Sequence, residues 1–165
     1  KAEQILSKYS ERFGSQYIAR FRAKLALPET APVEIIHECL ELLSAQAIDF
    51  TVFFRKLTTV ANGGDSESVR KLYRDPAAFD VWFEKWAKEA DLVALLSVMR
   101  AVNPVRIPRN HRVEEAIQNA YSGEYAPFHR LVDNLSSPYS DSAEYSEYEV
   151  PPRPEEIGRE TFCST

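Results

Sequence analysis

The sequence lacks the features that define several large classes of protein. Its 165 residues contain only two cysteines, Cys39 and Cys163, which is too few for a disulfide framework and fits a reducing compartment. No apolar run is long enough to span a membrane, and no signal-like stretch opens the chain. The 20 basic residues do not gather into a large patch. We therefore expect neither a membrane nor a nucleic acid among the partners.

Motifs that hold nucleotides or metals are also missing from the sequence. It contains no glycine-rich loop of the GxGxxG or GxxxxGK[ST] type. The stretch DFT at residues 49–51 faintly resembles a kinase DFG triplet, but we interpret Asp49 as a helix N-cap that precedes a core phenylalanine. His37 and Cys39 stand two residues apart on a helix and point to different sides, so they cannot share a metal ion. We therefore predict no catalytic residue, no cofactor-binding residue and no metal ligand in this chain.

Helical periodicity is what the sequence has in abundance. Apolar residues recur every three or four positions in successive segments, and no convincing strand alternation occurs. In residues 2–26 the apolar stripe consists of Leu6, Tyr9, Phe13, Tyr17, Phe21 and Leu25. Gly14 interrupts this stripe at a point where the helix could bend or split. These patterns, with short loops between the segments, predict an all-α, bundle-like domain of about seven helices over residues 1–137.

Aromatic residues at helical spacing predict the core of this domain. Trp82 and Trp86 share one face of a helical segment, and we interpret them as core residues rather than as a ligand-binding box. Phe53 and Phe54 are expected in the core as well. Cys39 lies in an apolar band and is expected to be a small buried hydrophobe.

The net charge of the chain is concentrated at its C-terminal end. Residues 1–137 carry 18 basic and 18 acidic groups, whereas residues 138–165 carry two basic and seven acidic groups, which accounts for the net charge of −5. Four prolines and three tyrosines accompany this acidic excess, and the helical pattern stops. We predict an extended, acidic, Pro/Tyr-rich tail over residues 138–165, which Tyr139, Tyr145 and Tyr148 anchor to the helical body. The chain starts at Lys1 rather than at methionine, so we expect it to be part of a longer protein.

Several stretches, taken in order, resemble one known family. They are FRAKLAL (Phe21–Leu27), IDFTVFFRKL (Ile48–Leu57), DVWFEKW (Asp80–Trp86), NPVRIPRN (Asn103–Asn110), VEEAIQNAYSGE (Val113–Glu124), FHRLVDNLSSPYSD (Phe128–Asp141), VPPRP (Val150–Pro154) and the terminal TFCST. Together they are similar to the C-terminal part of the selenoprotein O / YdiU family, over nearly the whole chain. One departure is Ala26, which stands where the family often has the glycine of KLGL.

The resemblance implies a family of pseudokinase-fold enzymes that transfer AMP from ATP to hydroxyl groups of proteins. The residues that bind ATP and Mg in that family lie in a kinase-like part of the chain that is missing here. The expected partners are therefore this kinase-like part and the protein substrates of the enzyme. The expected localisation is cytoplasmic in a bacterium and mitochondrial in a eukaryote.

The resemblance also gives a meaning to the terminal cysteine. The third residue from the end is selenocysteine in some members of the family and cysteine in others, and Cys163 occupies that place. A thiol on a tethered tail has a high effective concentration near its own domain, so it can form a reversible disulfide with a second cysteine. We therefore expect Cys163 to be a redox residue.

The most basic short stretch of the chain contains Arg106, Arg109 and Arg112. In one interpretation these arginines pair with nearby acids such as Glu114 and Glu115. The resemblance supports another interpretation, in which they dock the chain onto the missing catalytic part.

Three functions are compatible with these patterns. In the leading hypothesis the chain is the C-terminal helical region of a protein adenylyltransferase, which supports the kinase-like core, carries a redox-responsive tail and is no enzyme by itself. The second hypothesis is a free-standing helical module whose groove binds a partner helix or peptide without catalysis. The third, a thiol oxidoreductase that uses Cys163, is the weakest because no second cysteine stands near it in a CxxC arrangement.

Overall fold

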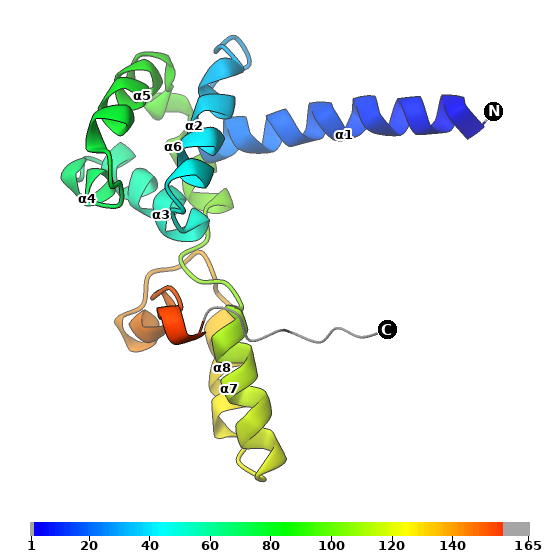
Figure 1. The fold of residues 1–165 in the computed structure, drawn as a ribbon, viewed down its shortest axis with the longest axis vertical. Coiled ribbons are helices and arrows are strands. Elements are labelled where there is room, and N and C mark those ends of the chain that lie inside the picture. The colour runs from blue at the N-terminus through cyan, green and yellow to red at the C-terminus, as the bar shows by residue number, and fades with distance from the viewer. Residues whose placement is uncertain (1, 157–165) are drawn as a thin grey trace. The chain divides into compact units, whose positions relative to one another are not determined.

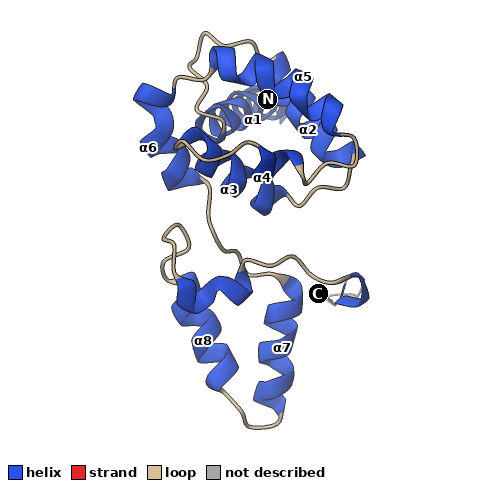
Figure 2. Cartoon of the chain, turned by 90° about the vertical axis from the view of Figure 1, so that its left-hand side faces the viewer, coloured by secondary structure: helices blue, strands red, loops and turns tan. Residues whose placement is uncertain are grey.

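A computed structural model describes the backbone of residues 2–156 and the side chains of residues 8–156, and this part of the chain contains helices and loops but no strand (Figure 1, Figure 2). The α-helices are α1 (Ala2–Lys24), α2 (Glu34–Ala45), α3 (Phe50–Ala61), α4 (Glu67–Arg70), α5 (Pro76–Glu89), α6 (Leu92–Val102), α7 (Asn110–Tyr121) and α8 (Ala126–Leu135). Two 3₁₀-helices follow, η1 (Ala143–Tyr148) and η2 (Pro154–Glu156). All of the α-helices except the short α4 have ten or more residues. The predicted all-α fold of about seven helices is confirmed.

The chain divides into two compact units, with the division between Asn103 and Pro104. The first unit contains α1 to α6, and the second contains α7, α8 and the described part of the predicted tail, residues 138–156. The boundary that the sequence predicts, between residues 137 and 138, separates periodic from aperiodic sequence rather than one compact unit from another. No helix among the described residues combines the length and the apolar character that crossing a bilayer requires.

The core of the first unit is built from aromatic residues of α3 and α5, as the sequence predicts. Phe53, Phe54, Trp82 and Trp86 are all buried. Each indole N–H donates to a backbone carbonyl, Trp82 Nε1 to that of Ile35 at 2.9 Å and Trp86 Nε1 to that of Leu25, just after α1, at 2.8 Å. Because a buried indole N–H without an acceptor is costly, these two bonds fix how α5 packs on α2 and on the end of α1.

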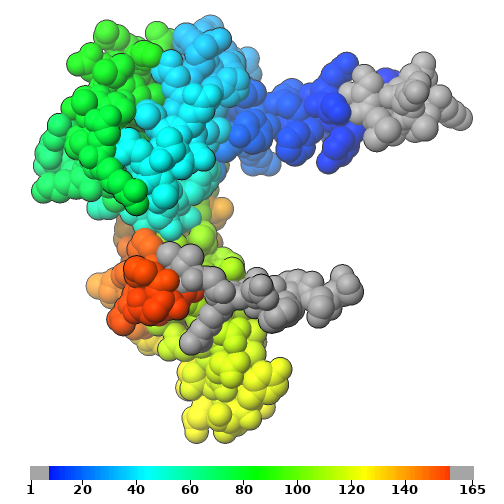
Figure 3. Space-filling model, viewed as in Figure 1, coloured from blue at the N-terminus to red at the C-terminus, as the bar shows by residue number. Residues whose placement is uncertain are grey.

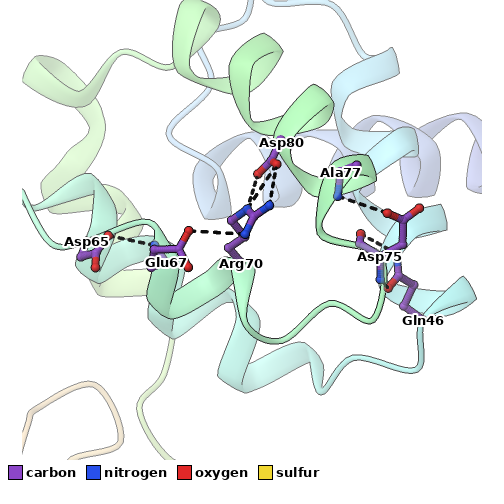
Figure 4. Close-up of polar contacts among 7 residues, drawn as sticks. All are labelled: Gln46, Asp65, Glu67, Arg70, Asp75, Ala77 and Asp80. Carbon is purple, nitrogen blue, oxygen red and sulfur yellow. Dashed lines mark hydrogen bonds and ion pairs between the residues drawn. The ribbon is translucent and has the colours of Figure 1, made fainter.

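Local signals in the sequence set where the helices of this unit begin. The Asp49 side chain caps α3 by accepting from the backbone N–H of Val52 at 2.8 Å, which confirms the predicted N-cap. The phenylalanine that follows Asp49 was expected in the core, but Phe50 is 41% exposed. Figure 4 shows the equivalent cap of α5, where Asp75 accepts from the backbone N–H of Ala77 at 3.1 Å. The same view shows Arg70 of α4 paired with Asp80 of α5 at 2.9 Å, a contact that holds these neighbouring helices together.

A buried polar network closes the first unit where the chain leaves it. The Asn103 side-chain amide donates to the Lys24 carbonyl at 2.9 Å and to the Thr58 hydroxyl at 3.0 Å. The Lys24 ammonium donates to the Asn103 side-chain oxygen at 3.2 Å and to the Val102 carbonyl at 3.0 Å. Burial lowers the pKa of Lys24. The network joins the ends of α1, α3 and α6, so it fixes how these three helices converge.

The first helix runs unbroken from Ala2 to Lys24, so the bend or split expected at Gly14 does not occur. An isolated glycine costs a helix only about 1 kcal/mol relative to alanine, which the rest of a long helix can offset. The apolar stripe of this helix changes environment along its length. Leu25, just after α1, is fully buried and Phe21 packs against the core, whereas Tyr9 and Phe13 are exposed.

The second unit is a hairpin of α7 and α8 with the segment after α8 packed against it. The hairpin turns at Gly123, whose φ of +86° suits glycine, and the two helices lie side by side (Figure 2). Its small core consists of Ala116, Leu131 and Tyr148. The anchoring role predicted for Tyr148 and Tyr145 is confirmed, because Tyr148 is buried and Tyr145 packs against this core. Tyr139, the third predicted anchor, is about half exposed.

Candidate functional site

The candidate site in the second unit is the set of arginines that the sequence singles out. We call residues 143–149, which are η1 and the Glu149 that follows it, the strap. Arg106 and Arg109 are buried, at 2% and 7% exposure, and Arg112 is half-buried. All three contact the strap. Since a buried guanidinium needs compensating partners, the contacts of each arginine decide what the site can do.

Arg106 is held by the chain that leads into the strap. Its Nη2 donates to the backbone carbonyls of Ser137 at 3.1 Å and Ser140 at 2.8 Å. Its Nη1 lies 3.6 Å from a carboxylate oxygen of Glu149, and its guanidinium carbon lies 5.6 Å from the centre of the Tyr145 ring. One buried side chain thus contacts two backbone carbonyls that precede the strap, and a carboxylate and an aromatic ring within the strap.

Arg112 and Arg109 hold the C-terminal half of the strap. Arg112 pairs with Glu115 at 2.8 Å, as one interpretation of the sequence predicts, and its Nη2 donates to the Glu147 carbonyl at 3.1 Å. Its guanidinium carbon lies 5.4 Å from the centre of the Tyr148 ring. Arg109 Nη2 donates to the Glu149 carbonyl at 3.5 Å. The docking role of these arginines toward a catalytic part stays a prediction, because the contacts described here are all within the second unit.

Arg130 of α8 completes the site and was missed by the sequence analysis. Its Nε pairs with Glu147 at 3.1 Å, its Nη2 donates to the Glu144 carbonyl at 2.9 Å, and its guanidinium carbon lies 5.4 Å from the Tyr145 ring. Hydrogen bonding to Glu147 raises the pKa of Arg130. Tyr145 therefore contacts the guanidinium groups of both Arg106 and Arg130. The acidic excess of the strap was the available signal, because such an excess requires cations on the surface that holds it.

A polar groove lies along α7 beside this site. It has a volume of about 400 Å³ and is lined by Asn110, His111, Arg112, Glu115, Gln118 and Glu156, among others. Burial is the main cause that lowers the pKa of His111, and the neighbouring arginines act in the same direction while Glu156 opposes it. Within residues 8–156 no group of three or more histidine, cysteine or acidic side chains is placed to hold a metal ion. The groove therefore offers hydrogen-bonding groups of mixed charge.

Of the two cysteines, the structure describes Cys39 and not Cys163. Cys39 is buried in the core of the first unit at 1% exposure, and burial raises the pKa of its thiol. This confirms its interpretation as a small buried hydrophobe. Cys163, the predicted redox residue, lies outside the described residues.

Comparison with known proteins relates nearly the whole chain to one family. A family model described as protein adenylyltransferase SelO matches residues 1–136. Two proteins named protein nucleotidyltransferase YdiU, from Rhodopseudomonas palustris strain BisB18 and Nitrobacter winogradskyi, are 40% and 39% identical over 172 and 173 residues, and each alignment covers 99% of this chain. A third, from Bradyrhizobium diazoefficiens, is 36% identical over 173 residues. These alignments cover 34–35% of the relatives, so the chain spans about a third of the length of the curated relatives it matches.

Proposed function

Since this chain belongs to the protein adenylyltransferase SelO family, we propose that it is the C-terminal helical region of an ATP-dependent enzyme that transfers AMP to Ser, Thr or Tyr hydroxyls of proteins. The family match over residues 1–136 is the observation that carries this proposal. The partners of the region are then the kinase-like part of the same protein and the protein substrates of the whole enzyme.

The role of this region in such an enzyme is to support the catalytic part. ATP and Mg are bound in the kinase-like part, as the resemblance implies, and the present sequence has no glycine-rich phosphate loop of its own. A rigid aromatic core, with both indole N–H groups satisfied, suits a region that must hold another in position.

The tail adds a redox function to this supporting role. The strap is tied to α7 by Arg112 and to α8 by Arg130, so the chain beyond it starts from a defined place in the second unit. We propose that the Cys163 thiol and a thiol of the catalytic part are oxidised together to a disulfide by a peroxide, which is reduced to water. Reduction by a dithiol would restore both thiols and release the tail.

The test compares AMP transfer by the longer protein and by this chain alone. We expect the longer protein to label itself or protein substrates with the AMP moiety of radioactive ATP, and the isolated chain to show neither labelling nor calorimetric ATP binding. Cys163→Ser in the longer protein should leave basal transfer intact and abolish its response to peroxide. AMP transfer by the isolated chain would contradict the proposed division of labour, and an unaltered peroxide response in the serine variant would contradict the redox role.

A helical interaction module without catalysis is the second candidate. A groove of about 420 Å³ between α2 and α5, with an apolar floor that includes Leu42 and Val81, favours it. An independent start codon immediately before Lys1 in the gene would support this candidate. An upstream reading frame that encodes a kinase-like part would support the adenylyltransferase.

A further inference from the structure

The exposed half of α1 carries an apolar face that no other described part of the first unit covers. Tyr9 is 67% exposed and Phe13 is 60% exposed, and Tyr17 is more than a third exposed. Their rings follow one another along the helix, with centroids 6.3 Å and 6.2 Å apart. In the space-filling view, α1 from residue 8 onward stands clear of the other helices of its unit until it reaches the core (Figure 3). A cluster of large exposed aromatics of this kind marks an interaction surface.

This face is continuous with an interface that the structure already contains. The ring of Tyr17 lies 4.7 Å from that of Phe21, and Phe21 lies 6.2 Å from the buried Phe54, so the row of rings runs from solvent into the core. The same side of α1 is therefore packed in its C-terminal half and bare in its N-terminal half. An amphipathic helix normally packs its whole apolar stripe against protein. We therefore expect a covering surface along the exposed N-terminal half of α1 as well.

Gly14, which borders this face beside Tyr17, gives a second and independent indication that a neighbour approaches this side of α1. It lies one turn before Ile18, whose side chain packs against the core, and next to Tyr17 on the helix surface. A Cβ built at Gly14 meets no atom within 4 Å, so nothing in the described part of the first unit requires glycine there. Glycine weakens a helix interior, so its use at this position fits the close approach of a backbone from outside the first unit.

We propose that the aromatic face of α1, defined by Tyr9, Phe13 and Tyr17 and bordered by Gly14, is the surface on which the remaining part of the longer protein packs. This inference rests on the proposed function, because it takes the chain to be one region of a larger enzyme. The curated relatives are about three times as long as this chain, which supplies an occupant in the same polypeptide. The covering surface is apolar, and part of its backbone lies against Gly14.

Hydroxyl-radical footprinting tests whether the face is covered. Tyr9 and Phe13 should oxidise several-fold more slowly in the longer protein than in the 165-residue chain, whereas the buried Phe53 should be slow in both. Equal oxidation of Tyr9 and Phe13 in the two proteins would overturn the proposal. Light scattering of the isolated chain identifies the competing occupant, because a dimer in which Tyr9 and Phe13 are already protected would assign the face to a second copy.

Gly14→Leu tests whether a backbone approaches Gly14 closely, because the substitution should change the melting temperature differently in the isolated chain and in the longer protein. Leucine favours helix and has free space in the isolated chain, so its melting temperature should be unchanged or higher. In the longer protein the same change should lower the melting temperature, because the side chain meets the covering backbone. Ser15→Leu, on the exposed opposite side of α1 from Phe13, is the matched control and should not lower the melting temperature of either protein. A Gly14→Leu effect of the same sign in both proteins would overturn the proposal.

An AMP-transfer assay on the same samples separates this inference from the proposed function. Protection of Tyr9 and Phe13 without AMP transfer would leave the docking face in place and remove the proposed activity. AMP transfer without protection of Tyr9 and Phe13 would leave the proposed activity in place and remove the docking face.

Discussion

Two alanines adopt a backbone conformation that normally favours glycine. Ala26 and Ala47 have φ values of 50° and 53°, and they follow α1 and α2. At both sites the next residue closes the helix end, with Leu27 N–H donating to the Arg22 carbonyl and Ile48 N–H donating to the Leu43 carbonyl, each at 2.9 Å. The left-handed conformation costs an L-residue roughly 1–2 kcal/mol, so both alanines are strained.

Ala47→Gly is therefore expected to raise the free energy of unfolding of the first unit by roughly 0.5–1 kcal/mol, because the relief of strain exceeds the entropy that glycine adds to the unfolded chain. Ala26→Gly should gain less, because it also removes a fully buried methyl group worth about 0.8 kcal/mol. Urea unfolding followed by tryptophan fluorescence measures both, since Trp82 and Trp86 lie in this unit. A destabilised Ala47→Gly variant would contradict the strain argument.

At the scale of single residues, the sequence predicts those features of the structure that depend on residues close together in the chain. The cap at Asp49 was predictable because its acceptor and donor are three residues apart. The left-handed conformation of Ala47 was not, because alanine carries no turn signal of its own. At Ala26 only the resemblance gave a hint, through the glycine that the family often has there.

The arginine contacts with the strap act between elements, and their strength depends on burial. Arg106→Ala should destabilise the second unit by roughly 1.5–3 kcal/mol, because the carbonyls of Ser137 and Ser140 lose a charged donor inside the protein. Arg130→Ala removes partly exposed contacts, which solvent screens, and should cost less than Arg106→Ala. Hydrogen exchange of the strap amides measures both effects. Equal loss of protection in the two variants would contradict the importance of burial.

The elements themselves were more predictable than their environments. Periodicity predicts the long helices because the apolar stripe is local in sequence. It could not show that the stripe of α1 is packed at Phe21 and bare at Phe13, since that depends on residues far away along the chain. The contacts of Arg130 with the strap join residues 14 and 17 positions apart across a loop, so a periodic pattern could not predict them either.

Because the two units are separate compact bodies, a probe in each would report different events, and the two cysteines supply such probes. Cys39 is enclosed in the core of the first unit, and burial keeps its thiol protonated by raising its pKa. Thiol reagents attack the thiolate, so Cys39 should react only when this unit unfolds. Cys163 lies in a stretch whose sequence offers little but Phe162 to pack, and it is expected to react quickly.

We therefore expect one rapid equivalent of labelling by a chromogenic disulfide reagent under native conditions, and a second equivalent only in denaturant. Cys163→Ser should remove the rapid phase, and Cys39→Ser, as the matched control, should remove the slow one. The slow phase should accelerate with urea in parallel with the loss of tryptophan fluorescence, because Cys39 shares its core with Trp82 and Trp86. Rapid labelling of Cys39 in the native chain would contradict the buried position, and protection of Cys163 would contradict an accessible redox tail.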